Sequence, residues 1–178
     1  MITTRGTPPT QPGPRAETII RRAGQHDVDP MRTLYREVGL LTALHADYSE
    51  AHNQAIRDHV QECAAELPAT LRRHEDLFWV ATSNELVVGM AGYNKRQRLI
   101  HSLFVAEPDQ SRGVGSMLLR GLLAEEVVQR APALLTVSPH NTRAIALYKR
   151  FGFRVVGPKL WHIGDSYPML DISMQRLH

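Results

Sequence analysis

The sequence has 178 residues, of which 43% are hydrophobic and 22% are charged, with a formal net charge of +3. This composition is typical of an ordinary globular protein, and the length suits one domain with a substantial core. The single cysteine, Cys63, excludes an internal disulfide and favours a reducing compartment, and the scattered basic residues argue against a nucleic-acid partner.

Residues 1–17 are predicted to form a disordered or loosely attached tail, because they contain four prolines and few apolar residues. They lack the apolar segment of a secretory signal peptide. No apolar run in the sequence reaches the ~20 residues that a membrane-spanning helix needs. We therefore expect a single cytoplasmic domain over residues 18–178, with no membrane partner.

The first part of that domain is predicted to be a strand followed by helices. Thr18–Arg22 is the expected strand, and Asp29 is expected to cap a helix that starts at Pro30. A second helix is expected to open at Asp47–Glu50, which resembles a capping box, to be broken or restarted at Pro68, and to continue over Ala69–His74. The apolar stripe of the first helix consists of Met31, Leu34, Tyr35 and Val38.

Three histidines, His45, His52 and His59, lie seven residues apart and could share one face of the second helix. Metal ligands on one helix are usually three or four residues apart, and no Cys, Asp or Glu completes a set here. The interpretation is surface or interface histidines, with no metal site.

Three short strands are predicted next, at Leu77–Thr82, Leu86–Tyr93 and Leu99–Val105, with a tight turn at Ser83–Glu85. Consecutive short strands of this kind favour an antiparallel meander. A helix with apolar residues from Met117 to Val128 then leads to another buried strand. Because a helix connects that strand to Leu99–Val105, the two strands should be parallel.

The final part of the chain is predicted to contain one helix and two strands. Asn141 or Thr142 caps the helix, and Gly152 ends it. The parallel strand before this helix is Leu134–Val137; the two strands after it are Phe153–Val156 and Tyr167–Met174, joined by a loop that contains Trp161 and His162.

Two closely spaced glycines, Gly113 and Gly115, stand between a predicted strand and a predicted helix. The first N–H groups of a helix have no partner within the helix, and glycine lets a ligand approach them closely. Together with the helix dipole, this arrangement favours a phosphate or pyrophosphate. A dinucleotide fingerprint would require glycine in place of Leu118, and a P-loop would require a Gly-Lys pair there. The pattern that remains is Gln110-x-x-Gly113-x-Gly115.

A second segment, Asn141-x-x-Ala144-x-x-Leu147-Tyr148-x-x-x-Gly152-Phe153, follows about 25 residues later. In this order and spacing the two segments resemble the GNAT superfamily of acyl-CoA-dependent N-acetyltransferases, and coarse resemblance extends from Thr18 to Leu177. The resemblance implies an α/β (α+β) fold. Its mixed central sheet would have about seven strands flanked by about four helices, with a splay between strands 4 and 5.

The resemblance also implies acetyl-CoA as the cosubstrate and no metal. Tyr148 would protonate the leaving thiolate, and the amide of Val105, or one near it, would stabilise the oxyanion. The strand backbone would pair with the pantetheine arm, and the loop amides would bind the pyrophosphate. The implied cofactor-binding residues are Leu103, Phe104, Val105, Gln110, Ser111, Arg112, Gly113, Val114, Gly115, Ser116 and Asn141.

The general base has no obvious candidate of the kind that the family often uses, a glutamate on the fourth strand. Leu99–Val105 contains no carboxylate, and His101 is its only titratable side chain. Strand alternation would place His101 on the face of Leu103 and Val105, as a catalytic base or as a structural residue. The loop carboxylates, Glu107 and Asp109, are expected to cap or solvate their loop.

The cost of deprotonation depends on the acceptor amine. A lysine amine of pKa ~10.4 requires about 4.6 kcal/mol to become neutral at pH 7, and an α-amine of pKa ~8 requires about 1.4 kcal/mol. The sequence therefore favours low-pKa amines or deprotonation through a water chain.

The acceptor is expected to be a primary amine of a small molecule or of a protein that attacks the thioester directly. Specificity should come from the helices between Met31 and Glu75 and from the Lys159–Tyr167 loop. Tyr35, Tyr48, Trp161 and His162 are the candidate pocket residues. The protein is expected to be a monomer or homodimer. The alternative is a non-catalytic acyl-CoA-binding or regulatory module, which the missing carboxylate favours and the presence of Asn141 and Tyr148 opposes.

Overall fold

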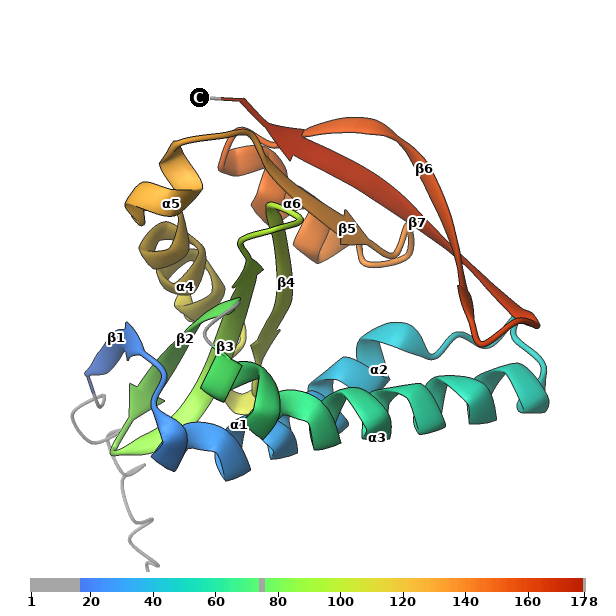
Figure 1. Ribbon diagram of the computed structural model, residues 1–178, viewed down its shortest axis with the longest axis horizontal. Coiled ribbons are helices and arrows are strands. Elements are labelled where there is room, and N and C mark those ends of the chain that lie inside the picture. Colours follow the sequence, from blue (N-terminus) through green and yellow to red (C-terminus); the bar gives the residue numbers. More distant parts are fainter. Residues whose placement is uncertain (1–16, 74–75, 178) are drawn as a thin grey trace, which may run out of the picture.

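The computed structural model describes residues 17–73 and 76–177, so the predicted tail lies, except for its last residue, outside the described residues. Seven strands form one mixed sheet in the order β1-β2-β3-β4-β5-β7-β6 (Figure 1). Among the described strands, only β4 and β5 pair in parallel, as predicted, and β2, β3 and β4 form the predicted antiparallel meander. The strands are β1 Thr18–Arg22, β2 Asp76–Ser83, β3 Leu86–Asn94, β4 Leu99–Val105, β5 Ala133–Val137, β6 Arg154–Ile163 and β7 Tyr167–Arg176.

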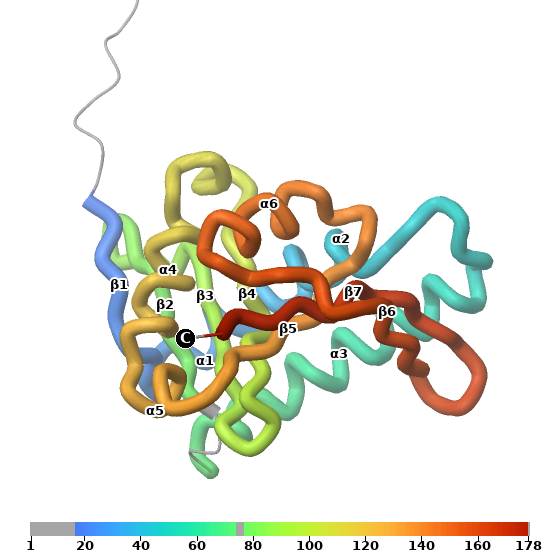
Figure 2. The backbone as a smooth tube through the Cα atoms, turned by 90° about the horizontal axis from the view of Figure 1, so that it is seen from above, coloured from blue at the N-terminus to red at the C-terminus, as the bar shows by residue number. Residues whose placement is uncertain are grey.

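Helices cover both faces of this sheet (Figures 1 and 2). One face packs on α1 and α3, and the other packs on α4 and α6. None of the described helices is long and apolar enough to cross a membrane. The helices are α1 Val28–Leu34, the π-helical η2 Tyr35–Gly39, α2 Leu40–Ala43, α3 Glu50–Arg73, α4 Val114–Leu123, α5 Glu126–Gln129 and α6 Thr142–Arg150; short 3-10 turns are η1 Gln25–Asp27 and η3 Glu107–Asp109.

The sheet splits between β4 and β5. Their described pairs are Leu99 with Leu134 and Ile100 with Leu135, at the start of both strands. Beyond these pairs the two strands diverge (Figure 1), which confirms the predicted splay. The C-terminal half of β4 therefore has a neighbour on its β3 side and an opening on its β5 side.

A β-bulge interrupts β4 at Ser102, whose φ is 53°, and adds one residue opposite β3. Leu103 and Val105 pack against the core under α4, whereas His101 lies edge-on to Phe78 on the α3 side. The prediction that His101 shares the face of Leu103 and Val105 is therefore wrong. Strand alternation holds only where no bulge shifts the register.

Helix α3 runs through Pro68 to Arg73, so the helix continues after this proline as predicted, but the predicted break or restart there is wrong. Proline removes one hydrogen bond and strains the preceding turn, at a cost of about 3 kcal/mol. Burial of Leu67 and Leu71 on either side of it offsets this cost. The cap also differs from the prediction, because the Ser49 hydroxyl, and not Asp47, accepts a hydrogen bond from the first turn at 3.2 Å.

The predicted helix with apolar residues from Met117 to Val128 is two helices, because α4 ends at Leu123 and Glu125 is extended (ψ 132°). This break lets the Glu125 carboxylate accept a hydrogen bond from the Trp79 indole at 2.9 Å and pair with Arg22. The break between α4 and α5 is thus held by contacts with Arg22 and Trp79 on two neighbouring strands, and the spacing of apolar residues along the helix does not reveal it.

The β6–β7 hairpin is longer than predicted and extends over α3 (Figure 1). Trp161 and His162 lie within β6, so the prediction that they occupy a loop is wrong. Packing against α3 explains the extension, because these strands supply part of a third apolar cluster. Its buried members are Ile56, Val60, Ile163 and Met169. This hairpin forms one wall of the site described below.

A buried residue, Asp27, occupies the N-cap position of α1 in place of the predicted Asp29, and its carboxylate bonds to the segment before the helix and not to the helix itself. Arg21 donates to both of its oxygens at 2.7 Å, and the Gly24 amide donates at 2.8 Å. Burial alone would raise the pKa of Asp27, but these donors outweigh burial and lower it. The resulting stabilisation is present above the unfolded-state pKa of about 3.9 and is lost as the pH falls through the folded-state value.

Asp27→Asn is therefore expected to lower the free energy of unfolding by about 2 kcal/mol at neutral pH, measured by urea denaturation. The exposed Asp29→Asn is the matched control and should change it by less than about 0.5 kcal/mol. The difference between wild type and Asp27→Asn should shrink as the pH falls below about 4. A difference that stays constant in acid would contradict the role of the charge.

Candidate active site

Two cavities meet at the splay. The larger, of about 690 Å³, lies beside the N-termini of α4 and α6, and the smaller, of about 280 Å³, lies between the sheet and α2–α3. Both are lined by Thr42, Leu103, Asn141, Ala144 and Tyr148. Ligands that enter from opposite faces of the sheet can therefore contact each other at this junction.

The glycine loop forms one end of the larger cavity. Gly113 caps α4 with φ +86°, and a Cβ placed on it would meet no atom within 4 Å. Ser111 is also left-handed, with φ 63°. Left-handed residues at a helix N-terminus turn successive N–H groups toward one point, which makes an anion-binding concavity.

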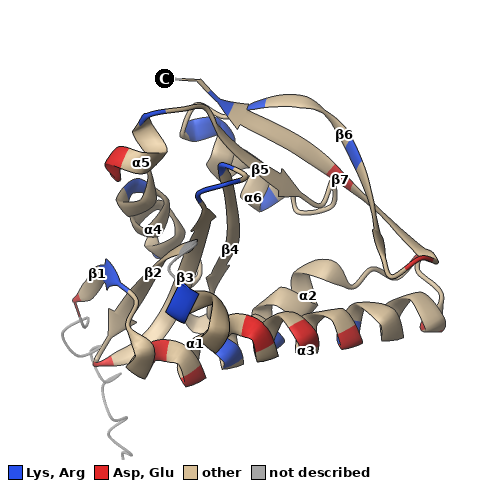
Figure 3. Ribbon diagram, viewed as in Figure 1, with Lys and Arg blue, Asp and Glu red and all other residues tan. Residues whose placement is uncertain are grey.

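Side chains hold this loop in place and add positive charge. Gln110 donates to the Val105 carbonyl at 3.0 Å, which ties the loop to the end of β4. Arg143, which the sequence prediction missed, donates to Gln110 at 3.0 Å and to the Ser111 hydroxyl at 2.8 Å. Arg143 and Arg150 both line the larger cavity. Over the rest of the chain, Lys and Arg are scattered, and acidic residues follow α1 and α3 (Figure 3).

Most of the predicted cofactor residues line the larger cavity, with two exceptions. The Phe104 ring turns to the α3 side, where it lies edge-on to Tyr35 at a centroid distance of 5.1 Å. The Arg112 guanidinium pairs with Asp109 at 2.8 Å. The residues that do line this cavity are Leu103, Val105, Gln110, Ser111, Gly113, Val114, Gly115, Ser116 and Asn141.

Two predicted residues of α6 lie at the junction. Asn141 caps the helix, as predicted, and its side-chain oxygen accepts a hydrogen bond from the Ala144 amide at 3.0 Å. The donor that Asn141 can offer a ligand is therefore its NH₂ group. Tyr148 is 7% exposed, and burial raises the pKa of its hydroxyl to about 12. Tyr148 thus remains protonated at neutral pH and can donate a proton.

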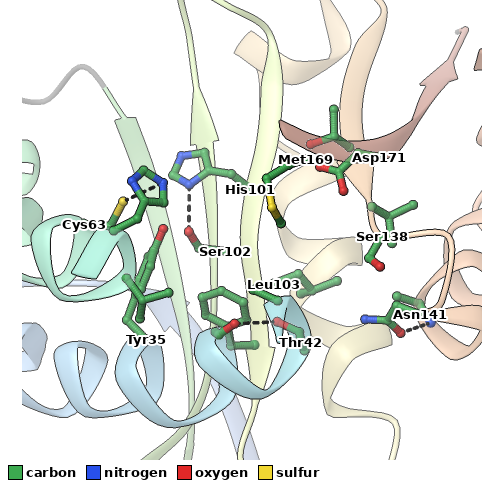
Figure 4. A pocket seen from close by; sticks show the side chains of 18 of the residues that line it. Tyr35, Thr42, Cys63, His101, Ser102, Leu103, Ser138, Asn141, Met169 and Asp171 are labelled. Carbon is green, nitrogen blue, oxygen red and sulfur yellow. Dashed lines mark hydrogen bonds between the residues drawn. The ribbon is translucent and has the colours of Figure 1, made fainter. Parts of the chain in front are cut away.

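The smaller cavity has aromatic and imidazole walls (Figure 4). Tyr35, Tyr48 and Trp161 line it, as predicted. His162 does not, because successive residues of a strand point to opposite faces and Trp161 takes the inner one.

Asp171, on β7, is the residue that the sequence prediction missed here. Among the described residues that line the smaller cavity, it alone carries a carboxylate. Its carboxylate accepts hydrogen bonds from the Trp161 indole, at 3.0 Å, and from Thr136. Burial raises the pKa of Asp171, and the two hydrogen bonds oppose that rise. The available signal was a single acidic residue within an apolar strand.

His101 lines the same cavity from β4 (Figure 4), and its Nδ1 lies 2.9 Å from the Ser102 hydroxyl. Cys63 also lines it, half-buried, with its sulfur 3.6 Å from Nε2 of His59. Burial raises the pKa of the Cys63 thiol and raises that of the neighbouring Tyr35 hydroxyl to about 12. The thiol is thus a weak nucleophile at neutral pH.

The three histidines at intervals of seven do not share one helix, because His45 precedes α3. The His45 ring stacks on His140 at 3.7 Å, and the His52 ring stacks on Tyr48 at 4.1 Å. In the described part of the chain, no group of three or more His, Cys, Asp or Glu residues could hold a metal ion.

Known proteins resemble the chain in both sequence and structure. Along the sequence, it is 27% identical over 156 residues to the peptidyl-lysine N-acetyltransferase YjaB of Salmonella typhimurium, which covers 86% of this chain and 95% of that protein. In fold, it resembles a GCN5-related N-acetyltransferase of Rhodopseudomonas palustris, with a TM-score of 0.72, 18% identity, and coverage of 94% of this chain and 100% of the other. A PaiA N-acetyltransferase of Thermoplasma acidophilum, solved in complex with coenzyme A, gives a TM-score of 0.66 at 19% identity, over 91% and 99% of the two chains.

The family comparison covers the larger cavity and part of the smaller one, whose residues Trp161, Met169 and Asp171 lie beyond the matched region. The model of the acetyltransferase (GNAT) family matches residues 38–153, which include β4, the glycine loop and α6. This protein therefore belongs to the GNAT family of acetyltransferases.

Proposed function

We propose that the protein transfers the acetyl group of acetyl-CoA to a primary amine, by direct attack of the amine on the thioester. The observation that carries this proposal is the meeting of the two cavities at Tyr148, in the splay between β4 and β5. A lysine side chain is the first acceptor to test, since the Salmonella relative is named a peptidyl-lysine N-acetyltransferase.

In this proposal, coenzyme A occupies the larger cavity. The pyrophosphate binds the backbone amides of residues 111–116, beside Arg143. The pantetheine arm pairs with the open side of β4 at Leu103–Val105, as an added strand pairs with a sheet edge. Asn141 donates its NH₂ group to the arm, and the thioester reaches the junction of the cavities.

The acceptor amine enters through the smaller cavity, from the α3 side of the sheet. Its nitrogen attacks the thioester carbon, and the amide of Val105 or a neighbouring amide stabilises the oxyanion. As the C–S bond breaks, Tyr148 protonates the thiolate, because its high pKa keeps a proton on the hydroxyl until that step.

We further propose a cytoplasmic enzyme, because its single cysteine, the free Cys63, suits a reducing compartment. We also propose that it is a monomer or a homodimer. Non-catalytic binding of an acyl-CoA remains the competing function. The acceptor cavity and the buried tyrosine at the junction favour catalysis, because a binding module requires neither.

Two measurements distinguish these functions. Calorimetry with acetyl-CoA measures binding, and an assay of thiol release with lysine peptides, α-amines and polyamines measures turnover. We expect saturable binding together with release of coenzyme A that depends on an amine. Tight binding without turnover on any amine would identify the binding module instead.

A further inference from the structure

We infer that Asp171 is the general base of the proposed reaction and accepts the proton of an acceptor that binds as an ammonium ion. This assignment rests on the proposed function and deepens it by naming the charge state of the substrate. It replaces the base that β4 does not provide, since that strand contains no carboxylate.

The position of Asp171 carries the assignment. Asp171 and Tyr148 both line the acceptor cavity, so both side chains border a ligand that occupies it. The two come from different elements, Asp171 from β7 and Tyr148 from α6. Figure 4 shows the Asp171 carboxylate on the β7 side of the cavity, across from His101 on β4. An acceptor that occupies this cavity therefore lies beside the carboxylate.

The surroundings of Asp171 hold the carboxylate in position and leave it able to accept a proton. The Trp161 indole and the Thr136 hydroxyl donate hydrogen bonds to it and thereby fix its orientation. Burial raises the pKa of Asp171 above that of an exposed aspartate, which makes it a stronger proton acceptor. A half-buried carboxylate among aromatic walls is also a favourable site for an ammonium group.

Other titratable groups surround Asp171. Lys159 of β6 stands opposite it in the strand register, and the remaining groups line the cavity. These groups are His45 before α3, His59 and Cys63 on α3, Tyr35 and Tyr48 around α2, His101 on β4 and Tyr148 on α6.

The proton balance of the reaction is complete with these groups. The acceptor ammonium gives one proton to the Asp171 carboxylate, directly or through a water molecule, and the neutral amine forms the C–N bond. The C–S bond breaks, and the sulfur receives its proton from Tyr148. The second proton of the nitrogen returns to Tyr148, and Asp171 releases its proton to solvent.

The pH dependence of kcat/KM, measured with a lysine peptide, tests this assignment. At pH 7 only about one lysine side chain in 2,500 is neutral. The active pair in wild type is the ionised Asp171 and the ammonium, so kcat/KM should be nearly constant between about pH 7.5 and 9.5. In Asp171→Asn only the neutral amine reacts, so kcat/KM should rise about tenfold per pH unit toward the lysine pKa. The loss at pH 7 should be about 100-fold or more.

Controls separate this role from a structural one. Asn can still accept the hydrogen bonds from Trp161 and Thr136, so the Kd for acetyl-CoA should not change. Asp165→Asn, at the exposed turn of the same hairpin, should retain the wild-type profile. With an α-amine acceptor of pKa ~8, the loss in Asp171→Asn should be about 100-fold smaller than with lysine.

Three outcomes would overturn the assignment. The first is a wild-type kcat/KM that itself rises tenfold per pH unit, a result that can be obtained without any variant. The second is an Asp171→Asn protein with unchanged kcat/KM, and the third is a plateau that His101→Gln abolishes and Asp171→Asn retains. Failure of the proposed function is distinct, because wild type would then bind acetyl-CoA but release no thiol with any amine.

Discussion

Tyr148→Phe is expected to lower kcat by about 100-fold or more, with little change in the Kd for acetyl-CoA. The variant removes one hydroxyl at the junction of the two cavities and keeps the ring that packs against Phe153. Without that proton donor, the thiolate must leave as an anion or take its proton from water. Steady-state thiol release measures kcat, and calorimetry measures the Kd.

Tyr93→Phe is the matched control for this variant. Tyr93 is 1% exposed in the same core and lines neither of the two cavities, so its loss tests the removal of a buried hydroxyl alone. We expect kcat to remain within about two-fold of wild type, as for a change distant from the reacting groups. Unchanged turnover in Tyr148→Phe would remove Tyr148 from the mechanism. A pKa of about 12 also predicts that Tyr148 causes no decline in kcat below about pH 11.

Gly113→Val is expected to weaken acetyl-CoA binding by at least about 100-fold, or about 2.8 kcal/mol. The Cβ at this position would extend into open space within the larger cavity, where the pyrophosphate is proposed to approach the amides. A β-branched side chain at φ +86° also strains the backbone that presents those amides. Calorimetry with acetyl-CoA, and with coenzyme A alone, measures the loss.

Gly164→Val is the control that separates the effect of backbone strain from the effect of blocking the approach of the pyrophosphate. Gly164 has φ +56°, and a Cβ there would likewise meet nothing within 4 Å, but it lies at the turn of the β6–β7 hairpin. Both variants should lose a similar amount of stability, and only Gly113→Val should lose the cofactor. Normal binding by Gly113→Val, or an equal loss in both variants, would mean that the proposed pyrophosphate site is misplaced.

Local sequence signals predicted the elements that position the cofactor cavity. Gly152 ends α6 with φ +85°, and Asn141 caps the same helix, because each position requires a particular residue type. The turn at Ser83–Glu85 is likewise confirmed, with positive φ at Asn84 and Glu85. The parallel pairing of β4 and β5 followed from the connecting helix, which needs no knowledge of distant contacts.

The features that the sequence did not reveal depend on contacts between distant segments. The bulge at Ser102 moves His101 to the α3 face, and no residue type within β4 marks it. Trp161 was assigned to a loop, whereas packing against α3 extends β6 around it. Asp171 became a candidate only when the fold placed β7 next to β5, the strand that borders the splay. The acceptor side of the site therefore required the structure, and the cofactor side largely did not.

Direct transfer across the junction is the central claim, and acetyl-CoA labelled at the acetyl carbonyl tests it. Purified protein is incubated with the labelled cosubstrate, with and without a lysine peptide, and mass spectrometry after digestion locates the label. Cys63 lines the acceptor cavity, but burial raises the pKa of its thiol, so no acetyl-cysteine intermediate should form. We predict label on the peptide amine and none on Cys63. Label on Cys63 that a later addition of peptide removes, or acetyl-CoA binding with no labelled peptide, would contradict direct transfer.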